Sequence, residues 1–153
     1  MTDMLHIRTA RPADLGAILT LLADDDLGRT RDDPDGAADP AYFAAFAAIA
    51  ADPNQQLLVA ERDGAVVGTF QLSFIPGLSH HGSWRAQIEA VRVARTLRGQ
   101  GLGRQMILWA IDAARARGCT LVQLTSSNSR TAAHRFYAGL GFTQSHAGFK
   151  RAL

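Results

Sequence analysis

A glycine-rich turn at residues 98–103 (RGQGLG) has the composition of a ligand-binding loop. Three glycines within five positions let the backbone adopt positive φ and come close to a bound molecule. The turn follows a strand-like run and begins a helical pattern over residues 102–117. The first amides of a helix lack intrahelical acceptors, and the helix dipole favours an anion beside them. The turn is therefore predicted to hold a diphosphate, with Arg95, Arg98 and Arg104 placed to add charge-assisted hydrogen bonds.

Two common phosphate-binding motifs do not fit this turn. A nucleotide P-loop requires a Lys followed by Ser or Thr, and the sequence contains no such pair. A dinucleotide fingerprint counted from Gly99 requires glycine where Arg104 stands, and no acid follows about 20 residues later. A turn that only connects a strand to a helix remains the alternative.

Glu89 is the best candidate for a general base. It lies in a strand-like run, where strict alternation would place it on the same face as Val91 and Val93. A carboxylate on an apolar face is costly to charge, so burial would strengthen it as a base. The alternatives are a salt bridge to Arg85 or Arg92, or a bulge that turns Glu89 toward solvent.

The rest of the pattern predicts the strands and helices that must position these residues. Asp63-Gly64 between two apolar runs predicts a β-hairpin. Residues 87–125 read as strand, helix and strand, a unit that joins parallel strands by a right-handed crossover. We expect strands at residues 6–9, 57–60, 65–72, 87–93, 121–125 and from 142 onward, helices at 12–22, 42–49, 102–117 and 131–139, and a loop over 24–40.

The composition is that of an ordinary globular domain. The 153 residues are 47% hydrophobic and 20% charged, which suits one domain with a sizeable core. No apolar run reaches the roughly 20 residues of a membrane span, and residues 1–10 lack an apolar signal segment. The single cysteine, Cys119, allows no internal disulfide. These features predict a cytoplasmic protein.

The charges are divided unevenly along the chain. Residues 1–84 contain 5 Arg and 12 Asp or Glu, whereas residues 85–153 contain 11 Arg or Lys and 2 Asp or Glu. The basic half is expected to attract a polyanion, either a nucleic acid or a phosphorylated coenzyme. The basic residues concentrate around the glycine turn and match no nucleic-acid-binding motif, so the coenzyme is favoured and no nucleic-acid partner is expected.

Two segments carry a family resemblance. Residues 98–103 resemble the (Q/R)-x-x-G-x-(G/A) coenzyme A signature of the GNAT superfamily of N-acetyltransferases, and residues 134–142 (HRFYAGLGF) resemble its F-Y-x-x-L-G-F element. Their order and separation fit, so the resemblance covers essentially the whole chain. It implies an α/β fold with a mixed, mostly antiparallel sheet, a splayed pair of parallel strands and helices on both faces, as one domain over residues 1–153.

A narrower similarity concerns the aminoalkylphosphonate N-acetyltransferases within this family. It rests on three short segments near the C-terminus, together with a pair of histidines before Trp84. The residues involved are 133–137, 144–146, 149–150, His80 and His81.

The resemblance implies direct transfer of an acetyl group from acetyl-CoA to an amine within a ternary complex, with no metal. The family's pantetheine arm lies along the strand of Val91 and Val93, where a bulge often splays the parallel strands. The family often has Asn seven residues before the motif tyrosine; here that position is Arg130, and Asn128 lies two residues earlier. The coenzyme contacts implied are Val91, Val93, Arg98, Gly99, Gln100, Gly101, Leu102, Gly103, Arg104, Asn128 and Arg130.

Tyr137 is the candidate general acid. A phenol has an ordinary pKa of about 10, a little above that of a thiol, so it can protonate a departing thiolate. The resemblance assigns this role to the motif tyrosine, and a core tyrosine is the alternative. Direct transfer needs no protein nucleophile, and Cys119 is expected at the opposite sheet edge from the glycine turn, as a small buried residue.

The acceptor is expected to be a small-molecule or peptide amine. The acidic loop over residues 24–39 would favour a cationic amine, or it is simply solvated. Arg130 and His134 would recognise an anion such as a phosphonate, or contact coenzyme phosphates. His80 and His81 are more typical of an exposed loop than of a metal site. Neither a membrane nor a metal is predicted as a partner. Homodimers occur in the family that the chain resembles. The alternative function is a sensor that binds acetyl-CoA without catalysis.

Overall fold

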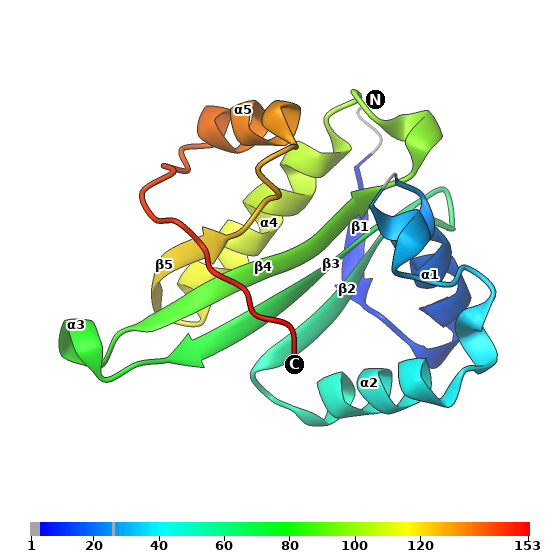
Figure 1. The fold of residues 1–153 in the computed structure, drawn as a ribbon, viewed down its shortest axis with the longest axis horizontal. Coiled ribbons are helices and arrows are strands. Elements are labelled where there is room, and N and C mark those ends of the chain that lie inside the picture. The colour runs from blue at the N-terminus through cyan, green and yellow to red at the C-terminus, as the bar shows by residue number, and fades with distance from the viewer. Residues whose placement is uncertain (1–3, 26) are drawn as a thin grey trace.

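The computed structural model describes residues 4–25 and 27–153. Its strands form one sheet in the order β1-β2-β3-β4-β5 (Figure 1). All neighbouring strands are antiparallel except β4 and β5, which run parallel, so the predicted mixed sheet is confirmed. The strands are β1 His6–Thr9, β2 Gln55–Arg62, β3 Ala65–Pro76, β4 Trp84–Val93 and β5 Cys119–Leu124.

Helices cover both faces of this sheet. Helix α4 packs behind β3, β4 and β5 in the view of Figure 1, and α1 lies on the opposite face against β3 and β4. Helix α5 lies beside the beginning of α4. The helices are α1 Leu15–Ala23, α2 Pro40–Ala51, α3 Ser79–Gly82, α4 Leu102–Ala116 and α5 Thr131–Gly139, with 3₁₀ turns η1 Pro12–Asp14, η2 Gly28–Thr30, η3 Gly36–Ala38 and η4 Arg95–Leu97.

The predicted hairpin joins β2 to β3. Asp63 and Gly64 both have positive φ, at 53° and 78°. Two successive residues of this kind give a turn whose twist matches that of the flanking strands, and Asp-Gly tolerates the conformation well. The turn and a register shift between Ala60 and Glu61 together bring Leu58 opposite Phe70 in the core.

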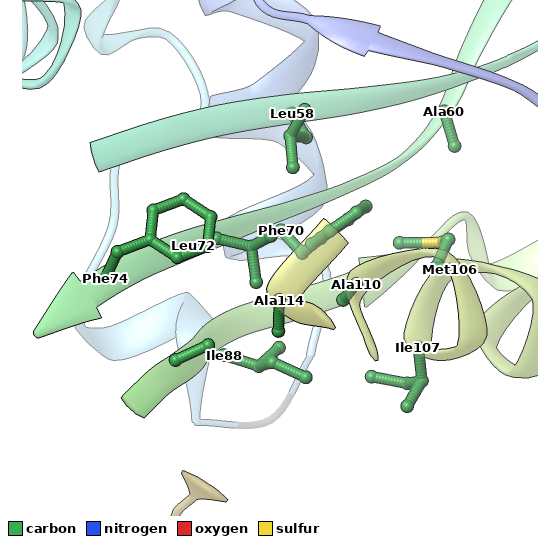
Figure 2. Packing of buried hydrophobic residues seen from close by; sticks show 11 residues of the cluster. Leu58, Ala60, Phe70, Leu72, Phe74, Ile88, Met106, Ile107, Ala110 and Ala114 are labelled. Atoms are coloured by element: carbon green, nitrogen blue, oxygen red, sulfur yellow. The ribbon is translucent and has the colours of Figure 1, made fainter. Parts of the chain in front are cut away.

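The main hydrophobic core lies between the sheet and α4 (Figure 2). Phe70 and Leu72 of β3 and Ile88 of β4 point toward Met106 and Ile107 of α4, and each is at most 2% exposed. The helical spacing of Leu102, Met106 and Ala110 supplies this face of α4, as its sequence pattern predicts. This core holds β4 and α4 rigidly, and these elements flank the glycine turn.

A charged network ties the start of the fold together. Arg8 of β1 donates to Asp14 at 2.7 Å and to Glu61 of β2 at 2.6 Å. The backbone amide of Arg11 also donates to the Asp14 carboxylate, at 2.6 Å. The hydrogen bond from Arg8 lowers the pKa of Asp14, although burial of the carboxyl opposes it. The network fixes η1, and with it the start of α1, against the sheet.

Two parts of the chain differ from the prediction. Residues 143–153, all of which the structure describes, form no strand, so the strands predicted after residue 142 are wrong for this structure. Helix α2 begins at Pro40 because the Asp39 side chain accepts the Ala41 amide at 2.8 Å, and none of its residues is buried. Within the described residues, no helix is long and apolar enough to cross a membrane.

Candidate active site

Strands β4 and β5 part midway along β4. Their parallel pairing ends at Ile88 and Leu124, and β4 continues to Val93 without pairing to β5. Opposite this point Ala90 has a φ of 52°, and the register with β3 shifts between Thr69 and Gln71. Such a register shift is a β-bulge, which bends a strand and increases its twist. The bulge and the splayed pair implied by the resemblance are thus both present.

The bulge overturns the prediction for the face of Glu89. Val91 and Val93 pack toward the α4 core, but Glu89 pairs with Gln71 on the opposite face and is exposed. The extra residue, Ala90, changes which positions of β4 face each way, so strict alternation fails beyond Glu89. Glu89 is therefore not a carboxylate buried among apolar groups. The alternative in which a bulge turns it outward is the one that the structure has.

Glu89 instead belongs to a row of polar side chains across the sheet. Gln87 donates to the Glu89 carboxylate at 2.6 Å, and Gln123 of β5 donates to Gln87 at 2.8 Å. On the neighbouring strands, Gln71 and Ser73 both donate to Gln55, at 2.9 and 2.8 Å. These residues form a polar floor, defined as Gln55, Gln71, Ser73, Gln87, Glu89 and Gln123. The floor can bind a polar molecule beside the point where β4 and β5 part.

The glycine turn has the backbone expected of an anion-binding loop. Gly99 and Gly101 have φ of 76° and 83°, which side chains larger than glycine rarely adopt. A Cβ at either position would meet no described atom within 4 Å, so the space above the turn is open. The amide of Gln105 makes the first bond of α4, to the Gly101 carbonyl at 3.1 Å. The amides that precede it point outward from the helix start, where a diphosphate is stabilised.

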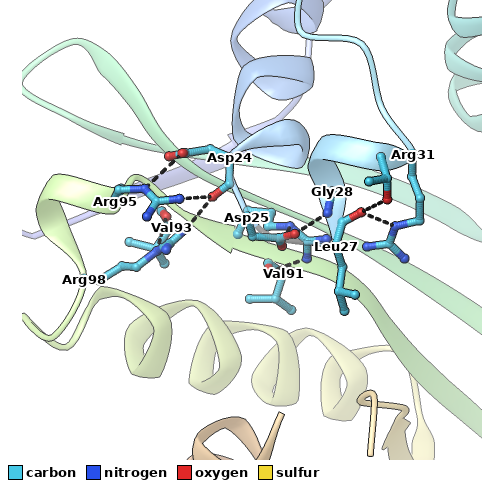
Figure 3. Close-up of polar contacts among 11 residues, drawn as sticks. Asp24, Asp25, Leu27, Gly28, Arg31, Val91, Val93, Arg95 and Arg98 are labelled. Atoms are coloured by element: carbon cyan, nitrogen blue, oxygen red, sulfur yellow. Dashed lines mark hydrogen bonds and ion pairs between the residues drawn. The ribbon is translucent and has the colours of Figure 1, made fainter. Parts of the chain in front are cut away.

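The arginines around the turn are engaged by the end of α1 (Figure 3). The Arg98 guanidinium donates to the Asp24 carbonyl at 2.9 Å and to the Val93 carbonyl at 3.2 Å. Arg95 donates to the Asp24 carboxylate at 3.1 Å. These contacts tie the α1 terminus to the turn. The predicted coenzyme contacts of Arg98 and Arg104 stay predictions, with Arg104 exposed in the first turn of α4.

A second and more buried ion pair also links β4 to the segment after α1. The Arg92 guanidinium is 3.0 Å from the Asp25 carboxylate, with only 10% of the arginine side chain exposed. Burial favours the neutral acid, but the amide of Gly28 and the charges of Arg92, Arg130 and Arg31 lower the pKa of Asp25 overall. Burial also lowers the pKa of Arg92. Positive charge from three arginines thus gathers around one carboxylate.

Tyr137 lies on α5 among aromatic rings. Its ring is 5.2 Å from that of Phe136 and 5.9 Å from that of Phe142, both in edge-to-face geometry. Burial raises the pKa of Tyr137, and the positive charges of Arg130 and Arg92 only partly oppose this. The phenol therefore holds its proton through the neutral range, as a general acid must.

Helix α5 brings its residues to the start of α4. A Cβ on Gly103 would lie 3.5 Å from the Phe136 ring, so the two helices touch at the glycine turn. Arg130 is the N-cap residue of α5, and Asn128 is exposed in the turn before it. His134 is hydrogen bonded to the Ser127 carbonyl at 2.9 Å. The structure thus gathers both sequence motifs at one end of β4 and β5. On the other side of the turn, Arg62 donates to Gln100 at 3.2 Å.

The remaining candidates are Cys119 and the two adjacent histidines. Cys119 begins β5 opposite Trp84, far along β4 from the glycine turn as predicted, and burial raises the pKa of its thiol. His80 and His81 are exposed, and the described part of the chain has no cluster of three groups that could hold a metal ion.

Much of the acidic loop is used by the fold. Asp24 and Asp25 pair with arginines, Asp32 accepts the Tyr42 hydroxyl at 3.2 Å, and Asp39 caps α2; Asp26 lies outside the described residues.

Sequence reasoning missed the polar floor and the role of Arg92. Gln55, Gln71 and Gln123 lie on three different strands, so only the register brings them together. Arg92 was considered as a partner for Glu89, but it pairs with Asp25 instead. A signal was present in the alternation of polar with apolar residues at Thr69, Gln71 and Ser73 in β3 and at Gln87 and Glu89 in β4, which marks one face as polar.

The chain matches the Acetyltransferase (GNAT) family over residues 20–142. Over 113 residues it is 40% identical to an aminoalkylphosphonate N-acetyltransferase of Salmonella typhimurium, which covers 74% of this chain and 73% of that protein. It is 35% identical over 79 residues to a glucosamine 6-phosphate N-acetyltransferase of Trypanosoma brucei brucei, 52% of each chain. A crystal structure described as a transcriptional regulator from Bacillus halodurans C-125 superposes with a TM-score of 0.94 at 44% identity, covering 98% of this chain and 100% of that one.

Proposed function

Because the chain belongs to the Acetyltransferase (GNAT) family, and so is an acyltransferase that uses acetyl-CoA, we propose that it acetylates a primary amine by direct transfer in a ternary complex. The observation that carries this proposal is the parting of β4 and β5 beside the glycine turn. The turn offers helix-start amides to a diphosphate. From Glu89 to Val93, β4 pairs with β3 but not with β5, and its β5 side offers a free strand edge to an extended pantetheine.

The carbonyls of β4 beside the glycine turn are already engaged by two arginines. Val91 and Val93 face α4 with their side chains, and their carbonyls accept hydrogen bonds from Arg92 at 3.0 Å and from Arg98 at 3.2 Å. A backbone amide of this stretch would polarise the thioester carbonyl. The coenzyme then lies between β4 and β5, with its diphosphate at Gly99–Gly103.

Glu89 and Tyr137 divide the proton transfers in this proposal. Glu89, exposed on the polar floor, takes a proton from the amine through a water molecule. The amine nitrogen forms a bond to the carbonyl carbon, and the carbon–sulfur bond breaks. Tyr137 gives its proton to the sulfur, since burial keeps the phenol protonated. No protein nucleophile takes part, so Cys119 has no role in the reaction.

We further propose that the acceptor carries an anion, such as a phosphonate or a phosphate, beside its amine. The names of the Salmonella and Trypanosoma enzymes compared above each join an amine to a phosphorus acid. In this chain, Arg92 of the unpaired β4 edge binds Asp25, and the charges of Arg130 and Arg31 also lower the pKa of that carboxyl. Guanidinium groups are well suited to bind such anions.

Calorimetry with acetyl-CoA, followed by a free-thiol release assay, tests the proposal. Binding without ATP or metal is expected, then turnover with 2-aminoethylphosphonate at least about tenfold faster in kcat/KM than with ethanolamine, because one charge-assisted contact contributes over 1.4 kcal/mol. Equal turnover of the two amines would refute the anionic acceptor but leave the acetyltransferase. Absence of acetyl-CoA binding would refute the function itself.

A sensor that binds acetyl-CoA without turnover is the second candidate. It is favoured by the description of the Bacillus halodurans structure as a transcriptional regulator. Such a protein would bind acetyl-CoA as tightly as the enzyme does. It would release no thiol with any amine, whether polyamine, aminoglycoside, amino acid or peptide, so the same assay separates the two functions.

A further inference from the structure

Two exposed arginines lie beside the glycine turn without a protein partner, and they are here called the outer arginine pair. Arg104 lies in the first turn of α4, and Arg135 lies midway along α5. Both side chains are exposed, and within residues 4–25 and 27–153 neither guanidinium forms a hydrogen bond or an ion pair. Arg95 and Arg98, by contrast, are held by the end of α1. The outer arginine pair is therefore available to a bound anion.

The contact between α4 and α5 brings this pair to one part of the surface. Arg104 directly follows Gly103, and Arg135 directly precedes Phe136. A Cβ on Gly103 would lie 3.5 Å from the Phe136 ring, so the helices touch one residue away from each arginine. Figure 1 likewise shows α5 beside the beginning of α4. Arginine side chains are long, so both guanidinium groups can reach a ligand that lies over the start of α4.

The two helices contain almost no negative charge. Within α4 and α5, all of whose residues the structure describes, the only acid is Asp112. Asp112 lies about two turns after Arg104 and pairs with Arg115 at 3.2 Å. The dipole of α4 adds positive potential at its start. The outer arginine pair thus lies where the charge of the helices favours a strongly negative ligand.

Acetyl-CoA carries a phosphate that the glycine turn does not account for. Its diphosphate joins the pantetheine to the adenosine, and a separate phosphate is attached to the 3′-oxygen of the ribose. With the pantetheine between β4 and β5 and the diphosphate at Gly99–Gly103, the adenosine end lies beyond the turn, on the outer surface. A phosphate monoester carries close to two negative charges at neutral pH, because its second pKa is about 6. Two guanidinium groups match this charge.

We propose that Arg104 and Arg135 bind the 3′-phosphate of acetyl-CoA and thereby select this coenzyme over acyl carriers that lack it. Such carriers include 3′-dephospho-acetyl-CoA and acetyl-phosphopantetheine. The inference rests on the proposed function, because it requires the diphosphate at the glycine turn. Both arginines contact the coenzyme far from its thioester, so they determine coenzyme affinity and leave the chemical step unchanged.

Calorimetry on the full chain with acetyl-CoA and with 3′-dephospho-acetyl-CoA tests the selection. The parent should bind acetyl-CoA about tenfold more tightly than the dephospho form. Arg104→Gln and Arg135→Gln should each reduce this ratio about threefold, because exposed ion pairs are individually weak, and the double variant should bring it close to one. The affinity for the dephospho form should stay the same in all variants. The matched control is Arg115→Gln, which removes an arginine 74% exposed at the far end of α4.

The outcomes separate this inference from the proposed function. Equal affinity of the parent for the two coenzymes would overturn the inference, and so would a double variant that keeps the preference. Equal weakening of both coenzymes by the variants would assign the arginines to the diphosphate and overturn it as well. A loss of preference in Arg115→Gln as large as in the test variants would show a general effect of charge in place of a site. Failure of the parent to bind either coenzyme would instead refute the proposed function.

Discussion

Strands β3 and β4 present Phe70, Leu72 and Ile88 to α4, whereas their other face presents Gln71 and Glu89. The apolar face is sealed, with each of its three residues at most 2% exposed, and the other face carries hydrogen-bonded side chains beside the point where β4 and β5 part. One face thus supports the fold and the coenzyme helix, and the other supports the proposed chemistry of the acceptor. The difference teaches that a bulge, more than the residue types alone, decides whether the proposed catalytic carboxylate of Glu89 shares a face with Val91 and Val93.

The largest expected effect comes from the sealed face. Phe70→Ala should lower the free energy of unfolding by about 3–5 kcal/mol, because it leaves a cavity under α4. Gln123→Ala, on the polar floor, should lower it by no more than about 1 kcal/mol. Urea denaturation of the two variants measures the contrast. Similar losses for both would mean that the polar floor supports the fold as much as the core does.

Tyr137→Phe tests the residue proposed to act on the sulfur of the coenzyme. We expect kcat to fall roughly 100-fold, or about 2.7 kcal/mol, with little change in the dissociation constant of acetyl-CoA. Burial raises the pKa of Tyr137, so the rate of the parent enzyme should fall only at a pH above the ordinary pKa of tyrosine. This alkaline fall should disappear in the variant. Steady-state kinetics across pH show this, and an unchanged kcat would remove Tyr137 from the mechanism.

Glu89→Gln tests the polar face. The rate should fall about tenfold or more, and the decline of the parent's rate at low pH should change shape, because the base is gone. Gln87→Ala is the matched variant, since it leaves the carboxylate but removes the hydrogen bond of 2.6 Å that orients it. A pH–rate profile identical to the parent's would assign proton removal to another group.

The smallest expected effect concerns the ion pair between Arg8 and Asp14. The pKa of Asp14 is lowered by its hydrogen bond from Arg8, so this carboxylate stabilises the fold above the pKa of the unfolded chain, near 4. That contribution disappears as the pH falls through the lower, folded value. Asp14→Asn should therefore cost on the order of 1 kcal/mol at pH 7 and much less near pH 2. Chemical denaturation at both pH values provides the check.

Local patterns predicted most of this fold because they depend on neighbouring residues. Asp63-Gly64 predicts its hairpin, and the apolar spacing from Leu102 predicts the face of α4 that packs on the sheet. Glu89 was assigned to the wrong face because one residue with positive φ, Ala90, shifts the alternation, and no local rule places a bulge at an alanine. The strands expected after residue 142 do not form in the structure.

The two motifs of the site could be predicted from the sequence, but most contacts between its residues could not. Both sequence motifs meet at the start of α4, as the resemblance implies. The pairing of Arg92 with Asp25 links residues far apart in sequence, and it follows from the packing of α1 on β4. The opposite net charges of residues 1–84 and 85–153 predict ion pairs between these two halves. They do not identify the residues that form the pairs.

The link from Asp24 to Arg95 and Arg98 has a kinetic consequence. A diphosphate that recruits Arg98 must take it from the Asp24 carbonyl, which it holds at 2.9 Å. Arrival of the first substrate would then loosen the end of α1, which Arg95 and Arg92 still hold, before the second substrate docks. Initial-rate patterns would show compulsory order, with the thioester leading and the amine following.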